Sequence, residues 1–313
     1  METTRDRRGT MRVGVVGLGR MGLGIARRLA RAGLGVTGFD PDGNKVQEAA
    51  RQGVRAVDSL AELAGELAPP RVVWVMVPAG PAVDEVLEGL LPHLGAGDVV
   101  VDGGNSHYRD TLRRAQRLGA RGIRFVDVGT SGGVWGAGEG YCLMVGGDAE
   151  AVKHLRPVFE ALAPAPDRGW GHVGPVGAGH FVKMVHNAVE YGLMQAYAEG
   201  FSLLRRKREF QLDVQQVAQI WRYGSVIRSW LLDLVARALE QDPELSGVAP
   251  YVEDSGEGRW AVTEALELEL SAPVLTLSLL QRLRSRDVDA YGDRLLAVLR
   301  QQFGGHPVRR RSP

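Results

Sequence analysis

The chain has 313 residues, 44% of them hydrophobic and 24% charged, which is typical of a folded globular protein and excludes fibrous and disordered classes. At this length we expect two domains, because single domains usually contain about 100–200 residues. The formal net charge is +1, so the chain has no overall field that would attract nucleic acid or an anionic membrane. Its longest apolar run, Val72 to Val77, is far shorter than the roughly 18 residues of a membrane-spanning helix.

The single cysteine, Cys142, cannot form an intrachain disulfide or supply a thiolate metal centre. No cluster of His, Cys and Asp has ligand spacing, so we expect no metal. Residues 1–10 lack the apolar stretch of a signal peptide, and we expect them to be a disordered extension. These features together favour a reducing, cytoplasmic location.

The first half of the chain alternates β-rich runs with helical stretches. A strand at 11–16, a helix at 21–32 and a strand at 35–39 come first, and further strands are predicted at 72–77, 98–102, 123–128 and 141–145. This alternation is typical of an α/β fold with a doubly wound, Rossmann-type parallel sheet. We place this domain at residues 11–176.

The β signal ends near residue 176. A continuous helical pattern of roughly 30 residues then runs from 177 to about 206, and amphipathic segments continue to 303 with breaks near 242–247 and 255–258. We therefore predict an all-helical second domain at 177–303, followed by a tail at 304–313.

A glycine motif follows the first predicted strand and opens the first helix, with Gly17, Gly19 and Gly22 in the spacing G-x-G-x-x-G. The first glycine permits a tight turn, the second lets the backbone approach a pyrophosphate, and the third packs helix on strand. The alternative is a merely structural turn. We expect a bound dinucleotide, contacted by the following residues: Gly17, Leu18, Gly19, Arg20, Met21, Gly22, Asp40, Val77, Pro78, Ala79 and Asn105.

Asp40 lies at the end of the second predicted strand, 23 residues after Gly17. An acid at about this spacing bonds the ribose 2′-hydroxyl of NAD and repels the 2′-phosphate of NADP. The next residue, Pro41, offers no charge to receive a phosphate. We expect NAD as the cofactor, although the segment Asp40 to Gly43 also has the composition of a simple turn.

Two glycine-containing turns follow later strands. The first is Asp102-Gly103-Gly104-Asn105-Ser106, and in a doubly wound sheet Asn105 would lie where ligands bind, beyond the strand carboxyl ends. The second, Gly129-Thr130-Ser131-Gly132-Gly133, offers backbone N–H groups and a hydroxyl to a carboxylate or a sugar hydroxyl. Either turn alone is a weak signal.

The long helical pattern carries the strongest functional signal. Lys183, His186, Asn187, Glu190 and Tyr191 fall on one face of a helix whose other faces are apolar. The alternative is a solvated polar stripe, but only four of the 38 basic residues are lysine, and solvated stripes in this chain use Arg, Glu and Asp. A lysine in apolar surroundings can lose its proton near neutral pH, which arginine cannot. The face thus holds a candidate base, Lys183, and a candidate acid, Glu190.

With these motifs together the chain resembles the decarboxylating 6-phosphogluconate dehydrogenases, in the β-hydroxyacid dehydrogenase superfamily. The resemblance implies that Lys183 is the general base and Glu190 the general acid. It implies that the substrate is held by Asn105, Ser131, Gly132, Gly133, His186, Asn187, Tyr191 and Arg282. It further implies that Arg300 and His306, near the end of the chain, complete the site of a neighbouring subunit in a homodimer or homotetramer.

The chain departs from the longer family members at their Gln-Lys-Gly-Thr-Gly-Lys-Trp motif. Here the segment reads Asp254-Ser255-Gly256-Glu257-Gly258-Arg259-Trp260, so the lysine and threonine that bind the substrate phosphate are replaced by Ser255 and Glu257. The chain is also about 150 residues shorter, like the short-chain, NAD-type branch.

The resemblance implies oxidative decarboxylation of 6-phospho-D-gluconate to D-ribulose 5-phosphate with reduction of NAD, a step of gluconate metabolism and the pentose phosphate pathway. One alternative is another β-hydroxyacid dehydrogenase acting on a related sugar or hydroxy acid, with or without a phosphate. A second is a cofactor-binding protein without catalysis.

Overall fold

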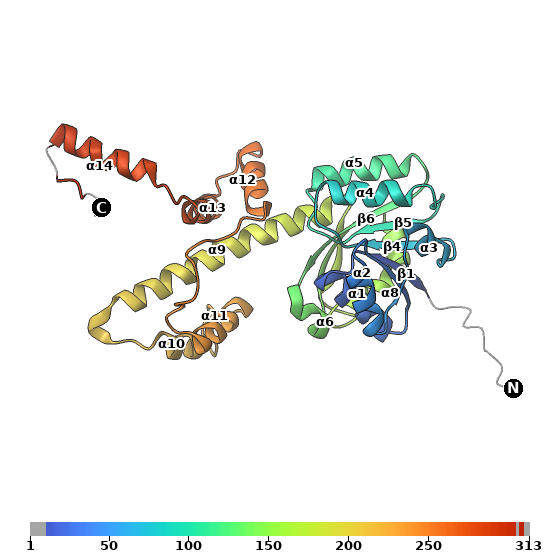
Figure 1. The fold of residues 1–313 in the computed structure, drawn as a ribbon, viewed down its shortest axis with the longest axis horizontal. Helices are drawn as coiled ribbons and strands as arrows, with labels where there is room; N and C mark the ends of the chain where they lie inside the picture. The colour runs from blue at the N-terminus through green and yellow to red at the C-terminus, as the bar shows by residue number, and fades with distance from the viewer. Residues whose placement is uncertain (1–10, 305–306, 310–313) are drawn as a thin grey trace. The chain divides into compact units, whose positions relative to one another are not determined.

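A computed structural model describes residues 11–304 and 307–309 (Figure 1). The chain divides into two compact units, Met1–Asn187 and Ala188–Pro313. The extension expected at residues 1–10, and His306 with most of the predicted tail, lie outside the described residues. Among the helices that the structure describes, none has the length and apolar character needed to cross a membrane.

The first unit is built on an eight-stranded sheet in the order β3-β2-β1-β4-β5-β6-β7-β8. The strands are β1 (Arg12–Val16), β2 (Gly35–Phe39), β3 (Arg55–Ala56), β4 (Val72–Val75), β5 (Val99–Asp102), β6 (Arg124–Ser131), β7 (Cys142–Gly146) and β8 (Trp170–Gly174). Neighbouring strands are parallel except for β6 and β7. The predicted Rossmann-type sheet is confirmed, and its first six strands have the order expected of a dinucleotide-binding fold.

Three details of the sheet differ from the sequence prediction. Strand β7 is antiparallel to β6, because η1 (Gly133–Trp135) and α6 (Gly136–Glu139) form a connection shorter than the dozen or so residues that a parallel crossover needs. Strands β3 and β8 were not predicted. Each pairs with a single neighbour, β3 has two residues, and β8 contains glycines that weaken its β signal.

Apolar side chains alternate between the two faces of the central strands. Val13 and Val15 of β1 join the core on one face, and Val16 joins the core on the other. The first core includes residues of α1 (Arg20–Arg31), α7 (Ala149–His154) and α8 (Arg156–Leu162). The second includes residues of α3 (Leu60–Gly65), α4 (Pro81–Leu90) and α5 (Tyr108–Gly119), while α2 (Gly43–Arg51) follows β2. Helices thus cover both faces of the sheet (Figure 1).

Helix α9 (Ala178–Arg206) confirms the long helix predicted from 177 to about 206, and the division between the two units falls within it. After η2 (Arg208–Phe210), the second unit continues with α10 (Val214–Trp221), α11 (Trp230–Gln241), α12 (Glu257–Glu267), α13 (Pro273–Ser285) and α14 (Tyr291–Gly304). Its described part contains no strand, which confirms the all-helical prediction. Many of its large apolar side chains are exposed, among them Leu266, Leu268, Leu270, Leu295 and Leu296.

Candidate active site

The turn after β1 has the geometry that a dinucleotide phosphate requires. Gly17 has a φ of 92°, and a Cβ on it would lie 2.3 Å from the Met76 carbonyl oxygen. A Cβ on Gly22 would lie 1.8 Å from the Gly17 oxygen, whereas one on Gly19 would meet no described atom within 4 Å. Gly19 also offers no side chain to cap α1, so the first-turn N–H groups can bind an anion. The three glycines therefore fit NAD in the roles predicted for them.

Asp40 lies against this turn and is 6% exposed. Its carboxylate accepts hydrogen bonds from the backbone N–H of Leu18 at 2.8 Å and of Asp42 at 2.9 Å. Lys45 of α2 places its Nζ 3.4 Å from the same carboxylate. The residue next to Asp40 gives no sign of this cation, because Lys45 lies five positions further along the chain.

The loops after β4 and β5 lie side by side at the same edge of the sheet. A Cβ on Gly104 would lie 3.2 Å from the Val77 carbonyl oxygen, so the two backbones are in close contact. Asp102, at the end of β5, is buried and accepts hydrogen bonds from Gly104 N at 3.1 Å and from Ser106 Oγ at 2.7 Å. Asn105 between them is exposed. The carboxyl edge of β1, β4 and β5 is the place where doubly wound sheets bind ligands.

A buried carboxylate anchors the beginning of α9. Asp127 of β6 is fully buried and accepts the backbone N–H of Gly177 at 2.7 Å and of His180 at 2.8 Å. These N–H groups belong to the first turn, where a helix leaves its donors unpaired and favours negative charge. Asp127 is not among the predicted site residues, although a charged residue inside an apolar strand run is a signal of a specific buried partner.

Glycines let the same turn of α9 rest directly on β6 and β7. A Cβ on Gly179 would lie 2.5 Å from the carbonyl oxygens of both Asp127 and Met144. A Cβ on Gly129 would lie 2.3 Å from the Cβ of Lys183. This packing fixes Lys183 beside the end of β6.

Four predicted site residues form one chain of contacts in the first unit. Lys183, which is 6% exposed, donates its amine to Asn187 Oδ1. The same oxygen lies 3.0 Å from His186 Nδ1, and His186 Nε2 lies 3.4 Å from Ser131 Oγ. A proton on Nδ1 would let the ring donate to Asn187 and accept from Ser131. The structure thus brings together Ser131 of β6 and three residues of α9.

Cys142 is a further neighbour of this group, and it is not among the predicted site residues. It pairs with Ser131 across β6 and β7. Burial raises the pKa of the Cys142 thiol, while the positive charge of Lys183 acts in the opposite direction. A thiol with a raised pKa is a weak nucleophile, so we assign Cys142 no chemical role.

A second group of predicted residues gathers in the second unit. The guanidinium carbon of Arg282 lies 3.3 Å from the centroid of the buried Tyr191 ring. The Tyr191 hydroxyl lies 3.4 Å from Ser255 Oγ, which donates to the buried Glu257. Glu190, on the preceding position of α9, is half-buried.

Arg259 and Arg300 are two further basic residues of the second unit. Arg259 donates to Asp254 at 2.6 Å, and the pKa of Asp254 is lowered although burial acts to raise it, because Arg259 and Gly256 N donate to it. Arg300 is exposed on α14. The roles predicted for the site residues stay predictions.

Comparison with known proteins decides the family. Residues 12–174 match the family model of the NAD binding domain of 6-phosphogluconate dehydrogenase, and residues 179–297 match the model of its C-terminal domain. The chain belongs to the 6-phosphogluconate dehydrogenase family. This confirms the resemblance seen in the sequence and the assignment of the first unit to NAD binding.

Two proteins named 6-phosphogluconate dehydrogenase match this chain over nearly its whole length. A Haloferax volcanii protein named NAD(+)-dependent, decarboxylating 6-phosphogluconate dehydrogenase is 48% identical over 96% of this chain and 99% of its own. The structure of Plasmodium falciparum 6-phosphogluconate dehydrogenase, studied with NADP+ and with 6-phosphogluconate, superposes with a TM-score of 0.80 at 25% identity, covering 96% of this chain and 67% of that one. Mycobacterium tuberculosis 3-hydroxyisobutyrate dehydrogenase shares the fold, with a TM-score of 0.70 at 24% identity over 86% of this chain and 91% of its own.

Proposed function

We propose that this chain oxidatively decarboxylates 6-phospho-D-gluconate to D-ribulose 5-phosphate and CO2 with NAD, as a cytoplasmic enzyme of the pentose phosphate pathway. The observation that carries the proposal is the buried Lys183, whose amine is held by Asn187 next to His186 and Ser131. A buried amine held in this way can take a proton from a substrate hydroxyl. The 48% identity to a relative named for this reaction and this cofactor supports the assignment.

Lys183 moves the proton at the substrate C3 hydroxyl. NAD, held by the turn Gly17–Gly22 and Asp40, would supply the acceptor for the hydride of C3. Neutral Lys183 takes the hydroxyl proton at the same time, so C3 becomes a carbonyl and the lysine becomes an ammonium. The product is a β-keto acid, and the ammonium polarises its carbonyl, which draws in the electron pair released as CO2 leaves. Lys183 returns its proton to the carbonyl oxygen, which gives an enediol.

Glu190 completes the reaction by donating a proton to C1 of the enediol, while Lys183 takes back the hydroxyl proton and the ketose forms. Glu190 follows Lys183 by seven residues, about two turns of α9, so both side chains lie along one face of the helix. The remaining contacts to the sugar acid are assigned to Asn105, Ser131, Gly132, Gly133, His186, Asn187 and Tyr191.

The phosphate is assigned to Arg282, with Arg300 and His306 supplied by a second copy of the chain. Arg282 is a single cation, and the buried Glu257 adds a negative charge near it through Ser255 and Tyr191. A phosphate dianion therefore needs a further charge-assisted donor. The exposed apolar side chains of the second unit support association with a second copy.

Mixing two inactive variants tests that association. Lys183→Ala chains are mixed with chains carrying Arg300→Ala and His306→Ala. If Arg300 and His306 act between subunits, one site in each mixed dimer joins an intact Lys183 to intact Arg300 and His306, and activity returns. If Arg300 and His306 serve their own chain, the mixture stays inactive.

A panel of sugar acids tests the reaction itself. We expect NADH formation and CO2 release in equal amounts from 6-phosphogluconate. Gluconate and 3-hydroxyisobutyrate should give at least 100-fold lower kcat/KM, because they lack the phosphate or the sugar hydroxyls. The alternative, a β-hydroxyacid dehydrogenase for acids without phosphate, is favoured by the loss of a cation at Ser255 and by Glu257. A higher kcat/KM for an acid without phosphate, or NADH formed without CO2, would establish that alternative.

A further inference from the structure

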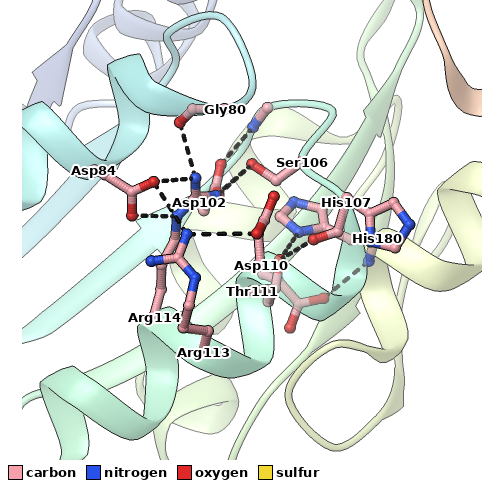
Figure 2. Close-up of polar contacts among 12 residues, drawn as sticks. Gly80, Asp84, Asp102, Ser106, His107, Asp110, Thr111, Arg113, Arg114 and His180 are labelled. Atoms are coloured by element: carbon pink, nitrogen blue, oxygen red, sulfur yellow. Dashed lines mark hydrogen bonds and ion pairs between the residues drawn. The ribbon is translucent and has the colours of Figure 1, made fainter.

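Arg114 is a buried arginine of α5 that belongs to none of the predicted motifs. Arg114 is 1% exposed. Its guanidinium forms a bidentate pair with Asp84, with Nε 3.0 Å from Oδ1 and Nη2 2.9 Å from Oδ2. Nη2 also donates to the Gly80 carbonyl oxygen at 2.8 Å, and Nη1 donates to Ser106 Oγ at 3.2 Å. Figure 2 shows these partners converging on the guanidinium.

The partners of Arg114 come from the ends of two loops. Gly80 ends the loop that follows β4, has a φ of 93°, and precedes α4, on which Asp84 lies. Ser106 ends the loop that follows β5, and its hydroxyl donates to Asp102 Oδ2, which lies 3.7 Å from Arg114 Nη1. One side chain therefore joins the segments 77–80 and 102–106.

Only arginine can make this set of contacts. Its planar guanidinium carries five N–H donors in a fixed fork, whereas a lysine ammonium has three donors at a single nitrogen. A buried charge is tolerated only when it is paired and hydrogen-bonded, so moving either loop away from Arg114 would leave a buried donor without its partner.

We propose that Arg114 is a positioning residue that sets the distance between the loop 77–80 and the loop 102–106, and thereby the place where the nicotinamide meets the substrate. This rests on the proposed function and on the prediction from the sequence that Val77, Pro78, Ala79 and Asn105 contact the cofactor. The pyrophosphate is assigned to the turn Gly17–Gly22 and the adenosine ribose to Asp40, and none of these residues contributes a polar contact to Arg114 among those that the structure describes. We call the contacts of Arg114 with Gly80, Asp84 and Ser106 the clamp. Loss of the clamp should therefore weaken binding of the nicotinamide and leave binding of the ADP-ribose part unchanged.

Two variants loosen the clamp, and a third is a matched control. Arg114→Lys keeps the charge but loses the fork, and Ser106→Ala removes the bond from Arg114 Nη1 to Ser106 together with the bond from Ser106 to Asp102. Arg113→Ala is the control, since Arg113 donates to the same Asp84 at 3.1 Å and is 56% exposed, with Asp110 as its other acidic partner. Thermal melting identifies any variant that fails to fold.

Binding of NADH and of ADP-ribose, which lacks the nicotinamide, separates positioning from a general structural role. We expect Arg114→Lys and Ser106→Ala to weaken NADH binding about fivefold or more and to lower kcat about 10- to 100-fold, because small displacements of reacting groups are costly. ADP-ribose binding should stay within twofold of wild type, and Arg113→Ala should change neither.

The outcomes distinguish the two proposals. If wild-type protein binds NADH but the two variants bind it equally well and keep their kcat, the clamp is refuted while the proposed function stands. Equal weakening of NADH and ADP-ribose would also refute it, since Arg114 would then act on the whole domain. A wild-type protein that does not bind NADH would overturn the proposed cofactor, and the role of the clamp with it.

Discussion

Replacing Asp40 with asparagine should shift the cofactor preference of this protein from NAD towards NADP. Two backbone N–H groups, of Leu18 and Asp42, hold the carboxylate in place. The side chain is 5% exposed, so the carboxylate cannot swing into solvent when a 2′-phosphate approaches. Asparagine has nearly the same shape and keeps an acceptor for Leu18 N, but it removes the negative charge.

The size of the effect follows from the charges around that position. Two like charges about 4 Å apart repel by roughly 1 kcal/mol in bulk water and by roughly 4 kcal/mol at the effective dielectric constant of a protein surface. Lys45 Nζ lies 3.4 Å from the carboxylate and offsets part of this repulsion, but its side chain is 46% exposed and therefore screened by solvent. We expect a net discrimination of about 1–3 kcal/mol, or roughly 5- to 150-fold in favour of NAD.

The ratio of kcat/KM for NAD to that for NADP measures this discrimination. It should fall by about that factor in Asp40→Asn. It should rise in Lys45→Ala, which removes the cation and leaves the carboxylate. A wild-type ratio of one or below, or an Asp40→Asn ratio equal to that of wild type, would show that this carboxylate does not select the cofactor.

Three further predictions test other parts of the structure. Lys183→Arg should fold and bind NADH normally yet lose about 10²- to 10⁴-fold in kcat, since arginine cannot act as a base at working pH; a near wild-type kcat would refute the base assignment. Gly129→Ala should cost about 1–3 kcal/mol of stability, because its Cβ would lie 2.3 Å from the Cβ of Lys183, whereas Gly43→Ala, where a Cβ meets no described atom within 4 Å, should not; equal melting temperatures would contradict the close packing of α9 on β6. The hydrogen bond from Arg114 lowers the pKa of Asp84 from 3.8 to about 2, so Asp84 stabilises the fold fully above pH 4 and loses that contribution as the pH falls towards 2. Melting temperatures between pH 5 and 2 should therefore fall less steeply in Asp84→Asn than in wild type, and parallel curves would contradict this.

Local patterns in the sequence predicted the parts of the structure that local physics determines. The spacing of the glycines in Gly17–Gly22 is enough to predict a turn that binds phosphate. The helical periodicity of α9 is enough to predict that Lys183, His186 and Asn187 share one face. The antiparallel β7 followed from the length of the β6–β7 connection, which strand alternation does not encode. Contacts between distant segments were not predictable in the same way. Asp127 beside the first turn of α9 is one example, because 50 residues separate it from Gly177 along the chain.

The residues that sequence patterns missed are mostly buried charges bound to backbone groups of other segments. Asp127 accepts two N–H groups at the start of α9, and Arg114 donates to the carbonyl of Gly80 at the start of α4. Asp127 is a charged residue within the apolar run of β6, and Arg114 shares the buried face of α5 with Thr111 and Leu118. Burying such a charge adds little net stability, but removing its partner is costly. The arrangement therefore penalises displacement of these segments, and the segments that it holds are the loops and the helix that carry the candidate site.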